Sequence, residues 1–168
     1  HGVMNTDNMS VLGLTIDYGP YGWLEDYDPD WTPNTTDAAT RRYRYGQQPA
    51  IAQWNLLQLA NAVYPLIEDA KPLEEALGRY AEIYQTRWHE MMATKLGLGA
   101  FESGDGELLE SLGEMLRAVE TDMTLFFRRL ADIDVQNDDA DRCRALLDAY
   151  YDPAAVDPAS EAGNNQRR

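Results

Sequence analysis

Apolar side chains recur at helical spacing from Gln47 to Tyr151, with only short breaks between the periodic stretches. A first helix is expected to begin near Pro49, because proline suits the first turn of a helix, and to stop at Pro72. A second is expected from about Leu73 to a glycine C-cap at Gly97. Three shorter helices should follow, the first two capped by Asp105 and Thr121 and the last running through Cys143. The sequence therefore predicts a mainly α-helical fold over residues 47–151.

These helices carry stripes of Trp, Tyr and Met, which we interpret as core positions rather than as a cofactor site. Cys143 lies in such a stripe and is expected to be a small buried hydrophobic residue. His89 also falls in a predicted helix, and we expect it to be a surface or core polar residue rather than a catalytic one. The polar tail, residues 152–168, has no apolar period and is expected to be disordered.

Charge and composition limit the classes of partner that the protein can bind. The chain has 168 residues with 14 Lys and Arg against 29 Asp and Glu, a formal net charge of −15. Clustered basic residues carry most nucleic-acid affinity, so a nucleic-acid partner is not expected. No stretch has the length and apolarity of a membrane span, and the single cysteine cannot form an internal disulfide. We therefore expect no membrane association and a cytoplasmic protein, in bacteria or, for a eukaryotic chain, in mitochondria.

The residues before the helices are organised differently. The short aliphatic run from Ser10 to Ile16 lies between two polar segments and is expected to be a strand with a loop at each end. From Tyr18 to Tyr45 the chain is rich in acidic, aromatic, Gly and Pro residues without a sustained period. A connection of that length indicates a functional loop.

Three side chains flank the expected strand: Asp7 and Asn8 before it, and Asp17 after it. Carboxylate and amide oxygens suit Mg²⁺, which takes one or two carboxylates together with water and phosphate oxygens. A straight strand rises roughly 3.3 Å per residue, so the loops at its ends would have to fold back to share one ion. The sequence predicts a metal site formed by these two loops.

The same stretch resembles the catalytic region of protein kinases. His1 and Asn8 stand at the spacing of the kinase His-Arg-Asp histidine and the metal-binding Asn, and Asp17 begins a counterpart of the Asp-Phe-Gly motif. Val3 occupies the place of the kinase catalytic Asp. Because an aliphatic side chain cannot accept a proton, ordinary kinase chemistry lacks its base here.

Longer stretches resemble the selenoprotein O family, the YdiU-type pseudokinases: HGVMNTDNMS, LGLTIDYGPYGWLEDYDPDW, QQPAIAQWNLLQLANA and TDMTLFFRRL. The resemblance implies a kinase-like fold that binds ATP in a flipped orientation. It also implies an enzyme that transfers AMP from ATP to Ser, Thr or Tyr hydroxyls of protein substrates.

The resemblance further implies roles for individual residues. Asn8 and Asp17 would hold Mg²⁺, with Mn²⁺ as an alternative. Asp17 would also lie near the nucleotide phosphates, and Asp7 would accept the hydroxyl proton. The implied organisation is a partial kinase-like domain with catalytic and metal loops (1–22), an acidic aromatic loop (23–46), a helical C-lobe (47–151) and the tail.

On this interpretation the chain is a fragment that starts at the catalytic loop and lacks the N-lobe. Residues 1–40 contain no Lys or Arg, and the first basic residue is Arg41. Phosphoryl-transfer sites share the nucleotide phosphates between a metal, a Lys and backbone amides. We therefore expect the chain alone to bind ATP poorly and to transfer nothing.

Two other functions stay open. One is a protein kinase that transfers the γ-phosphate with Asp7 in place of the missing base. The other is a non-catalytic pseudokinase scaffold whose acidic loop docks a partner. Val3 favours the scaffold, whereas the retained metal ligands count against it.

Two further patterns bear on metal and substrate binding. Asp26, Asp28 and Asp30 alternate like the first ligands of an EF-hand loop, but Trp31 stands where that loop needs a glycine, so calcium binding is not expected. The basic cluster is expected to hold the acids of the loop rather than a substrate; it comprises Arg41, Arg42 and Arg44.

Overall fold

The computed structural model describes residues 2–15, 22–32, 34–134 and 136–156. These residues are mainly helical, which confirms the predicted class, and their extended pairing is limited to two isolated β-bridges. They form two compact units. The first takes the residues up to Leu24 and those from Asp28 to Trp88, and the second takes Glu25–Tyr27 and the residues from His89 onward.

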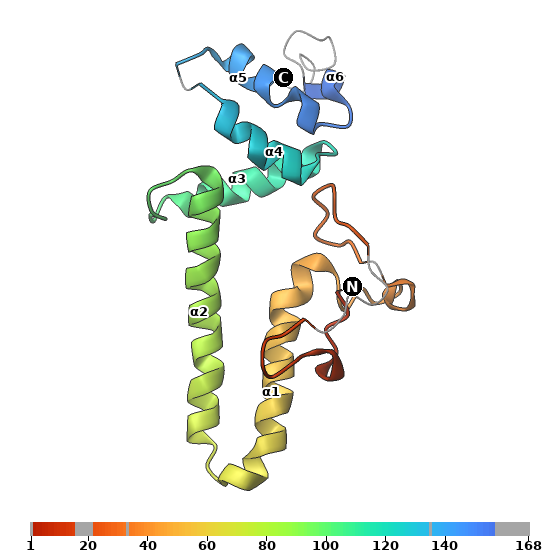
Figure 1. Ribbon diagram of the computed structural model, residues 1–168, viewed down its shortest axis with the longest axis vertical. Helices are drawn as coiled ribbons and strands as arrows, with labels where there is room; N and C mark the ends of the chain where they lie inside the picture. The colour runs from red at the N-terminus through yellow and green to blue at the C-terminus, as the bar shows by residue number, and fades with distance from the viewer. Residues whose placement is uncertain (1, 16–21, 33, 135, 157–168) are drawn as a thin grey trace. The chain divides into compact units, whose positions relative to one another are not determined.

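Helix α1 (Gln48–Ile67) begins where the sequence predicts, with Pro49 in its first turn. It ends at Glu68 instead of Pro72, because Glu68 adopts a left-handed conformation with φ 56° and its N–H bonds back to Tyr64. Pro72 therefore does not stop α1. It lies in the first turn of α2 (Lys71–Leu96), where a missing N–H costs nothing. Figure 1 shows α1 and the beginning of α2 as two arms joined by this short turn.

The end of α2 confirms the predicted glycine cap. Gly97 has φ +70°, a conformation in which a side chain would be strained, and the Leu98 N–H reaches back to the Ala93 carbonyl oxygen at 2.9 Å. Earlier in α2, the Tyr80 hydroxyl donates to the Pro49 carbonyl oxygen at 2.9 Å, which ties the two helices of the first unit together. Burial raises the pKa of Tyr80.

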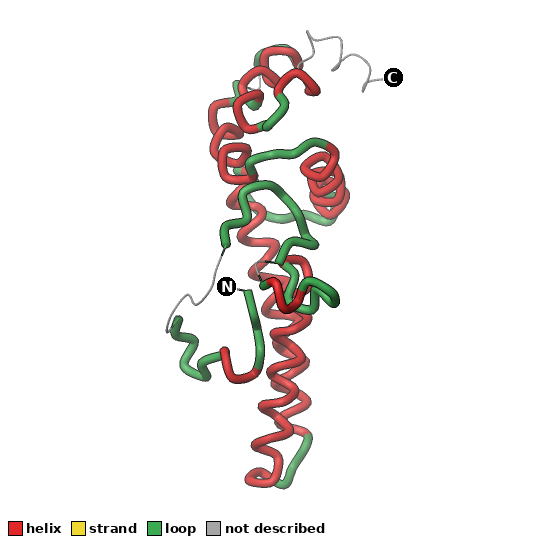
Figure 2. Tube along the Cα trace, turned by 90° about the vertical axis from the view of Figure 1, so that its right-hand side faces the viewer, coloured by secondary structure: helices red, strands yellow, loops and turns green. Residues whose placement is uncertain are grey.

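The predicted strand from Ser10 to Ile16 is wrong over its described residues, 10–15. The segment turns instead, because the Ser10 hydroxyl accepts from the Leu12 N–H and the Gly13 N–H bonds to the Ser10 carbonyl. Gly13 has φ +69°, which suits a turn and not a strand. In Figure 2 most of the described chain before α1 is drawn as loop.

The loop before α1 is packed by short polar contacts. The loop contains the short 3-10 turn η2 (Thr35–Asp37), and it ends in a second one, η3 (Tyr45–Gln47), directly before α1. The Gly46 N–H donates to the Pro29 carbonyl oxygen at 2.8 Å, and a Cβ at position 46 would lie 3.0 Å from that oxygen. The two segments of the loop therefore approach so closely here that a side chain at position 46 would require the backbone at residue 29 to shift.

The second unit contains shorter helices around a small core. The core consists of Leu116, Phe126 and Ala149, with Tyr27, Tyr150 and others packed against it. Its elements are α3 (Asp105–Ala118), α4 (Met123–Arg129), η4 (Leu130–Asp132), α5 (Asp139–Ala145), η5 (Leu147–Ala149) and α6 (Pro153–Val156).

Two predicted caps differ from the structure by one residue. Asp105 is the first residue of α3 rather than its cap, and its carboxylate accepts from the Glu102 N–H at 2.7 Å. Asp122, not Thr121, caps α4 by accepting from the Leu125 N–H at 2.9 Å. The Thr121 hydroxyl is fully buried and donates to the Val119 carbonyl oxygen instead, so it is not free to cap the helix.

The apolar stripes of the helices are less buried than predicted. Trp54 is 43% exposed, Tyr64 47% and Met91 48%, and Cys143 is only partly buried. Helical periodicity identifies an apolar face, but it does not say whether another element covers that face. No helix among the described residues is long and apolar enough to cross a membrane.

Candidate functional site

The predicted site residues Asp7 and Asn8 lie on one short 3-10 turn, η1 (Thr6–Asn8). The Asn8 N–H bonds to the Asn5 carbonyl oxygen at 3.0 Å and closes the turn. The side-chain Nδ2 of Asn8 donates to the Val3 carbonyl oxygen, also at 3.0 Å. Both side chains are exposed at the turn, where they can meet a ligand. Asp17 lies outside the described residues.

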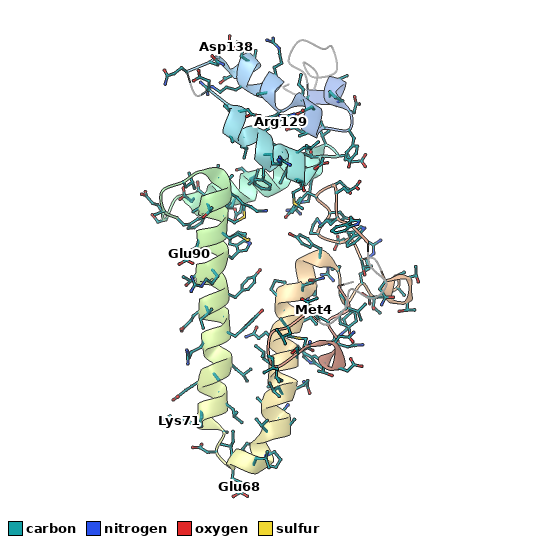
Figure 3. The ribbon with its side chains drawn as sticks, viewed as in Figure 1. Met4, Glu68, Lys71, Glu90, Arg129 and Asp138 are labelled. Carbon is teal, nitrogen blue, oxygen red and sulfur yellow. The ribbon has the colours of Figure 1, made fainter. Side chains whose placement is uncertain are left out.

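The first contact that holds this turn comes from α1. Asn55 is 5% exposed, and its Nδ2 donates to the Met4 carbonyl oxygen at 2.7 Å. The same nitrogen lies 2.7 Å from the Met9 Sδ. Asn55 therefore contacts the chain on both sides of the turn. Met4 is labelled beside α1 in Figure 3.

A second contact comes from the loop before α1. The Tyr43 hydroxyl donates to the Asn5 Oδ1. Tyr43 is in turn fixed by its backbone N–H, which donates to the Asp37 Oδ2 at 2.8 Å. Next to it, the Arg42 guanidinium carbon lies 4.6 Å from the centre of the Trp54 ring, within the range of a cation–π contact.

The basic cluster serves the loop. The Arg44 Nε lies 3.0 Å from the Asp30 Oδ1, which confirms for this pair that the cluster holds acids of the loop. Asp30 also closes a local turn, because its N–H donates to the Asp28 Oδ1 at 2.8 Å. Asp28 and Asp30 of the acidic run therefore stabilise the conformation of the loop.

A cavity of about 490 Å³ is lined both by the chain around and after the turn and by residues of α1. Its walls are mostly apolar, with a few polar groups between them, and they include Thr6 of the turn. The lining comprises Thr6, Met9, Ser10, Val11, Trp54, Asn55, Leu56, Gln58, Leu59 and Ala62.

The chemistry of the turn fits a hard cation. It offers a carboxylate from Asp7 and an amide oxygen from Asn8, and oxygen is the donor that Mg²⁺ prefers. The Asn8 Nδ2 donates to the Val3 carbonyl oxygen, and the Oδ1 of the same amide is the atom that could bind a cation. Among the described residues there is no group of three or more His, Cys, Asp or Glu side chains that could hold a metal. The metal roles of Asn8 and Asp17 therefore stay predictions.

Sequence reasoning gave no role to Asn55 or Tyr43. A signal for Asn55 is present in the periodicity, because it follows the buried Ile51 by one helical turn and shares its buried stripe. An amide on a buried stripe needs a hydrogen-bond partner, so it indicates a contact with another segment. Tyr43 carries no such signal, since its partner depends on the path of the loop.

Comparison of the sequence with models of protein families identifies the family of the chain. The model of the family described as "Protein adenylyltransferase SelO" matches residues 1–158. The match covers the turn, the loop and all the described helices. The chain therefore belongs to the SelO family.

Curated relatives agree with this assignment. A protein of Rhodopirellula baltica named "Protein nucleotidyltransferase YdiU" is 67% identical over 136 residues, which cover 80% of this chain and 25% of the relative. A protein of the same name from Aromatoleum aromaticum is 56% identical over 151 residues, 90% of this chain and 28% of the relative. The chain thus spans about a quarter of the length of these relatives.

Proposed function

We propose that this chain carries part of the active site of a protein nucleotidyltransferase that moves AMP from ATP to hydroxyl side chains of proteins. The observation that supports this most is the exposed turn with Asp7 and Asn8, braced from α1, in a chain of the SelO family. The names of the relatives support nucleotidyl transfer, and transfer to Ser, Thr or Tyr is part of the proposal.

In the proposed reaction Asp7 is the general base. Its carboxylate accepts the proton of the attacking hydroxyl while the hydroxyl oxygen forms a bond to the α-phosphorus of ATP. The bond from that phosphorus to the bridging oxygen breaks, and pyrophosphate leaves. The exposed position of Asp7 on a short turn lets a protein side chain approach it.

Asn8 and Asp17 would hold Mg²⁺, with Mn²⁺ as an alternative. When bound, the ion would offset negative charge on the phosphates. The Asn8 side chain is already oriented for this role by its bond to Val3, so little freedom is lost when a cation binds.

We also propose that the helices after Gln47 form a kinase-like C-lobe, and that residues 1–22 provide its catalytic and metal loops. The mainly helical content and the loop-before-helix order support this assignment. A cytoplasmic compartment, which ATP as donor favours, belongs to the same proposal.

The test uses a full-length hybrid in which this chain replaces the matching quarter of the Rhodopirellula baltica relative. The hybrid is incubated with ATP, Mg²⁺ and candidate cytoplasmic proteins, and intact masses are measured. We expect an AMP-sized increase on the hybrid or on a substrate. A phosphate-sized increase would identify a kinase instead, and no increase on any protein would favour the scaffold.

The role of Asp7 has its own test in the hybrid. We expect Asp7→Asn to lower the transfer rate about a hundredfold or more, in line with the contribution of a general base. Glu75→Gln is the matched control, because it removes one negative charge at an exposed position of α2. Equal rates for Asp7→Asn and Glu75→Gln would refute the assignment of Asp7.

A further inference from the structure

Asn55 is an unusual residue to bury in α1. Its side chain is 5% exposed, and its Oδ1 is buried without a hydrogen-bond partner among the described residues. A buried acceptor left in this state lowers the stability of the fold. An apolar side chain of similar size, such as Leu, would avoid that cost. Asn55 is therefore poorly explained by a contribution to the stability of α1.

What Asn55 does provide is a tie between α1 and the turn. Its Nδ2 donates to the Met4 carbonyl oxygen and contacts the Met9 Sδ, both at 2.7 Å. Met4 precedes the turn with Asp7 and Asn8, and Met9 follows it directly. A single amide thus holds both ends of the segment that carries the proposed base and metal ligand.

Asn55 is a direct contact between this segment and α1. A cavity of about 490 Å³ is lined by residues of the chain after the turn and of α1, so side chains do not fill all the space beside this contact. Asn8 bonds to Val3 within the same segment. The Tyr43 hydroxyl reaches Asn5 from the loop before the helix, so this contact connects the turn to α1 indirectly.

We propose that Asn55 is a positioning residue, which holds the Asp7–Asn8 turn against α1 in the geometry required for nucleotidyl transfer. This inference rests on the proposed function for its effect on activity, but the tie itself can be measured without activity. Misplacement of a catalytic group by about 1 Å can cost a hundredfold in rate, so a loss of the tie should be visible in kcat.

The activity test compares Asn55→Leu with Asn61→Leu in the full-length hybrid. Asn61 lies on the same helix, is exposed, and undergoes the same substitution. We expect Asn55→Leu to lower kcat for AMP transfer about ten- to a hundredfold with an unchanged thermal midpoint, and Asn61→Leu to leave both unchanged. Wild-type kcat in Asn55→Leu would overturn the proposal.

Two more variants separate positioning from folding. Asn55→Ala removes the donor without adding bulk, and Asn55→Gln keeps an amide donor on a longer arm. We expect Gln to retain more activity than Ala at equal helix content. If activity falls only in proportion to lost helix content across all three variants, Asn55 is merely structural and the proposal fails.

The second readout is hydrogen exchange on the 168-residue chain, which needs no activity. We expect Asn55→Leu to speed amide exchange in residues 4–9 while exchange within α1 stays unchanged. Unchanged exchange in residues 4–9 would refute the tie. If the unmutated hybrid makes no AMP adduct while exchange responds as expected, the proposed function fails and the tie stands.

Discussion

Asp37 is a nearly buried carboxylate on which the loop before α1 depends. Its side chain is 6% exposed and accepts three hydrogen bonds, from the Thr40 hydroxyl at 2.7 Å and from the N–H groups of Arg42 at 2.9 Å and Tyr43 at 2.8 Å. Burial raises the pKa of Asp37, but these hydrogen bonds and the Arg42 charge outweigh burial and hold the pKa below its usual value. The Tyr43 hydroxyl donates to Asn5, beside the Asp7–Asn8 turn. By fixing Tyr43, the Asp37 carboxylate therefore contributes indirectly to the position of the turn.

We expect Asp37→Asn to lower the free energy of unfolding at pH 7 by about 1–3 kcal/mol, because an amide cannot accept all the bonds that the carboxylate accepts. The pKa of Asp37 is lowered on folding, so its contribution is present above the unfolded value of about 4 and is lost as the pH falls through the lowered value. The difference between wild type and variant should therefore shrink in acid. Urea unfolding at several pH values measures it.

The matched control is Glu110→Gln, which removes one negative charge at an exposed position of α3. It should change stability little at any pH. A stability difference for Asp37→Asn that does not vary with pH would contradict the assigned role of the charge.

At the scale of elements, the start of α4 is bonded both to η5 and to the segment that contains Glu25. The Asp122 N–H bonds to the Ala149 carbonyl and the Met123 N–H to the Glu25 carbonyl, and Asp122 also caps α4 with its side chain. At the other end of α4, the Arg129 Nε bonds to Asp148 in the turn η5 at 2.9 Å, at the place labelled in Figure 3. This helix of seven residues is thus held at both ends by contacts outside itself.

We expect Asp122→Ala to lower the free energy of unfolding by about 1 kcal/mol, the usual cost of losing an N-cap. Asp139→Ala is the control, because Asp139 lies in the first turn of α5 but does not cap it. Chemical denaturation of both variants gives the comparison. An equal loss in the two would show that general charge near a helix start, and not the cap, is responsible.

The elements also show how far the sequence predicts this fold. The start of α1 and the glycine end of α2 follow from local rules about Pro and Gly, and the structure confirms them. Pro72 and Thr121 were misjudged, because a proline can begin a helix as well as end one and a buried hydroxyl bonds elsewhere. The predicted strand from Ser10 to Ile16 is wrong over its described residues, because a strand needs a partner strand and no local pattern supplies one.

For the candidate site, the sequence leads to Asp7 and Asn8, and their catalytic and metal roles stay predictions. Adjacent polar residues identified the turn with Asp7 and Asn8, and the structure places both on η1. Asp17, the second half of the predicted metal site, lies outside the described residues. The ties through Asn55 and Tyr43 could not be predicted, because they join residues that are 51 and 38 positions apart.

For the whole molecule, the distribution of charge matters most. The net charge is −15, and the turn with Asp7 lies in a stretch of 40 residues without Lys or Arg. The negative field over this region opposes the approach of a triphosphate, and the opposition is weakened by salt and divalent ions.

We therefore expect the 168-residue chain alone to bind ATP much more weakly than the full-length hybrid, and to form no AMP adduct. Calorimetric titration with ATP and Mg²⁺ compares the two proteins, and intact mass tests for adducts. Equal affinities, or an AMP adduct made by the chain alone, would show that the residues present here hold the nucleotide without further help.

The close approach of Gly46 to Pro29 has a consequence for how this family can vary. A Cβ at position 46 would lie 3.0 Å from the carbonyl oxygen of residue 29. Because every residue type carries this backbone oxygen, the constraint on position 46 does not depend on the proline at position 29. We expect relatives to keep glycine at position 46 even where position 29 is not proline. Alignment of many members of the family measures this, and frequent alanine at position 46 would contradict it.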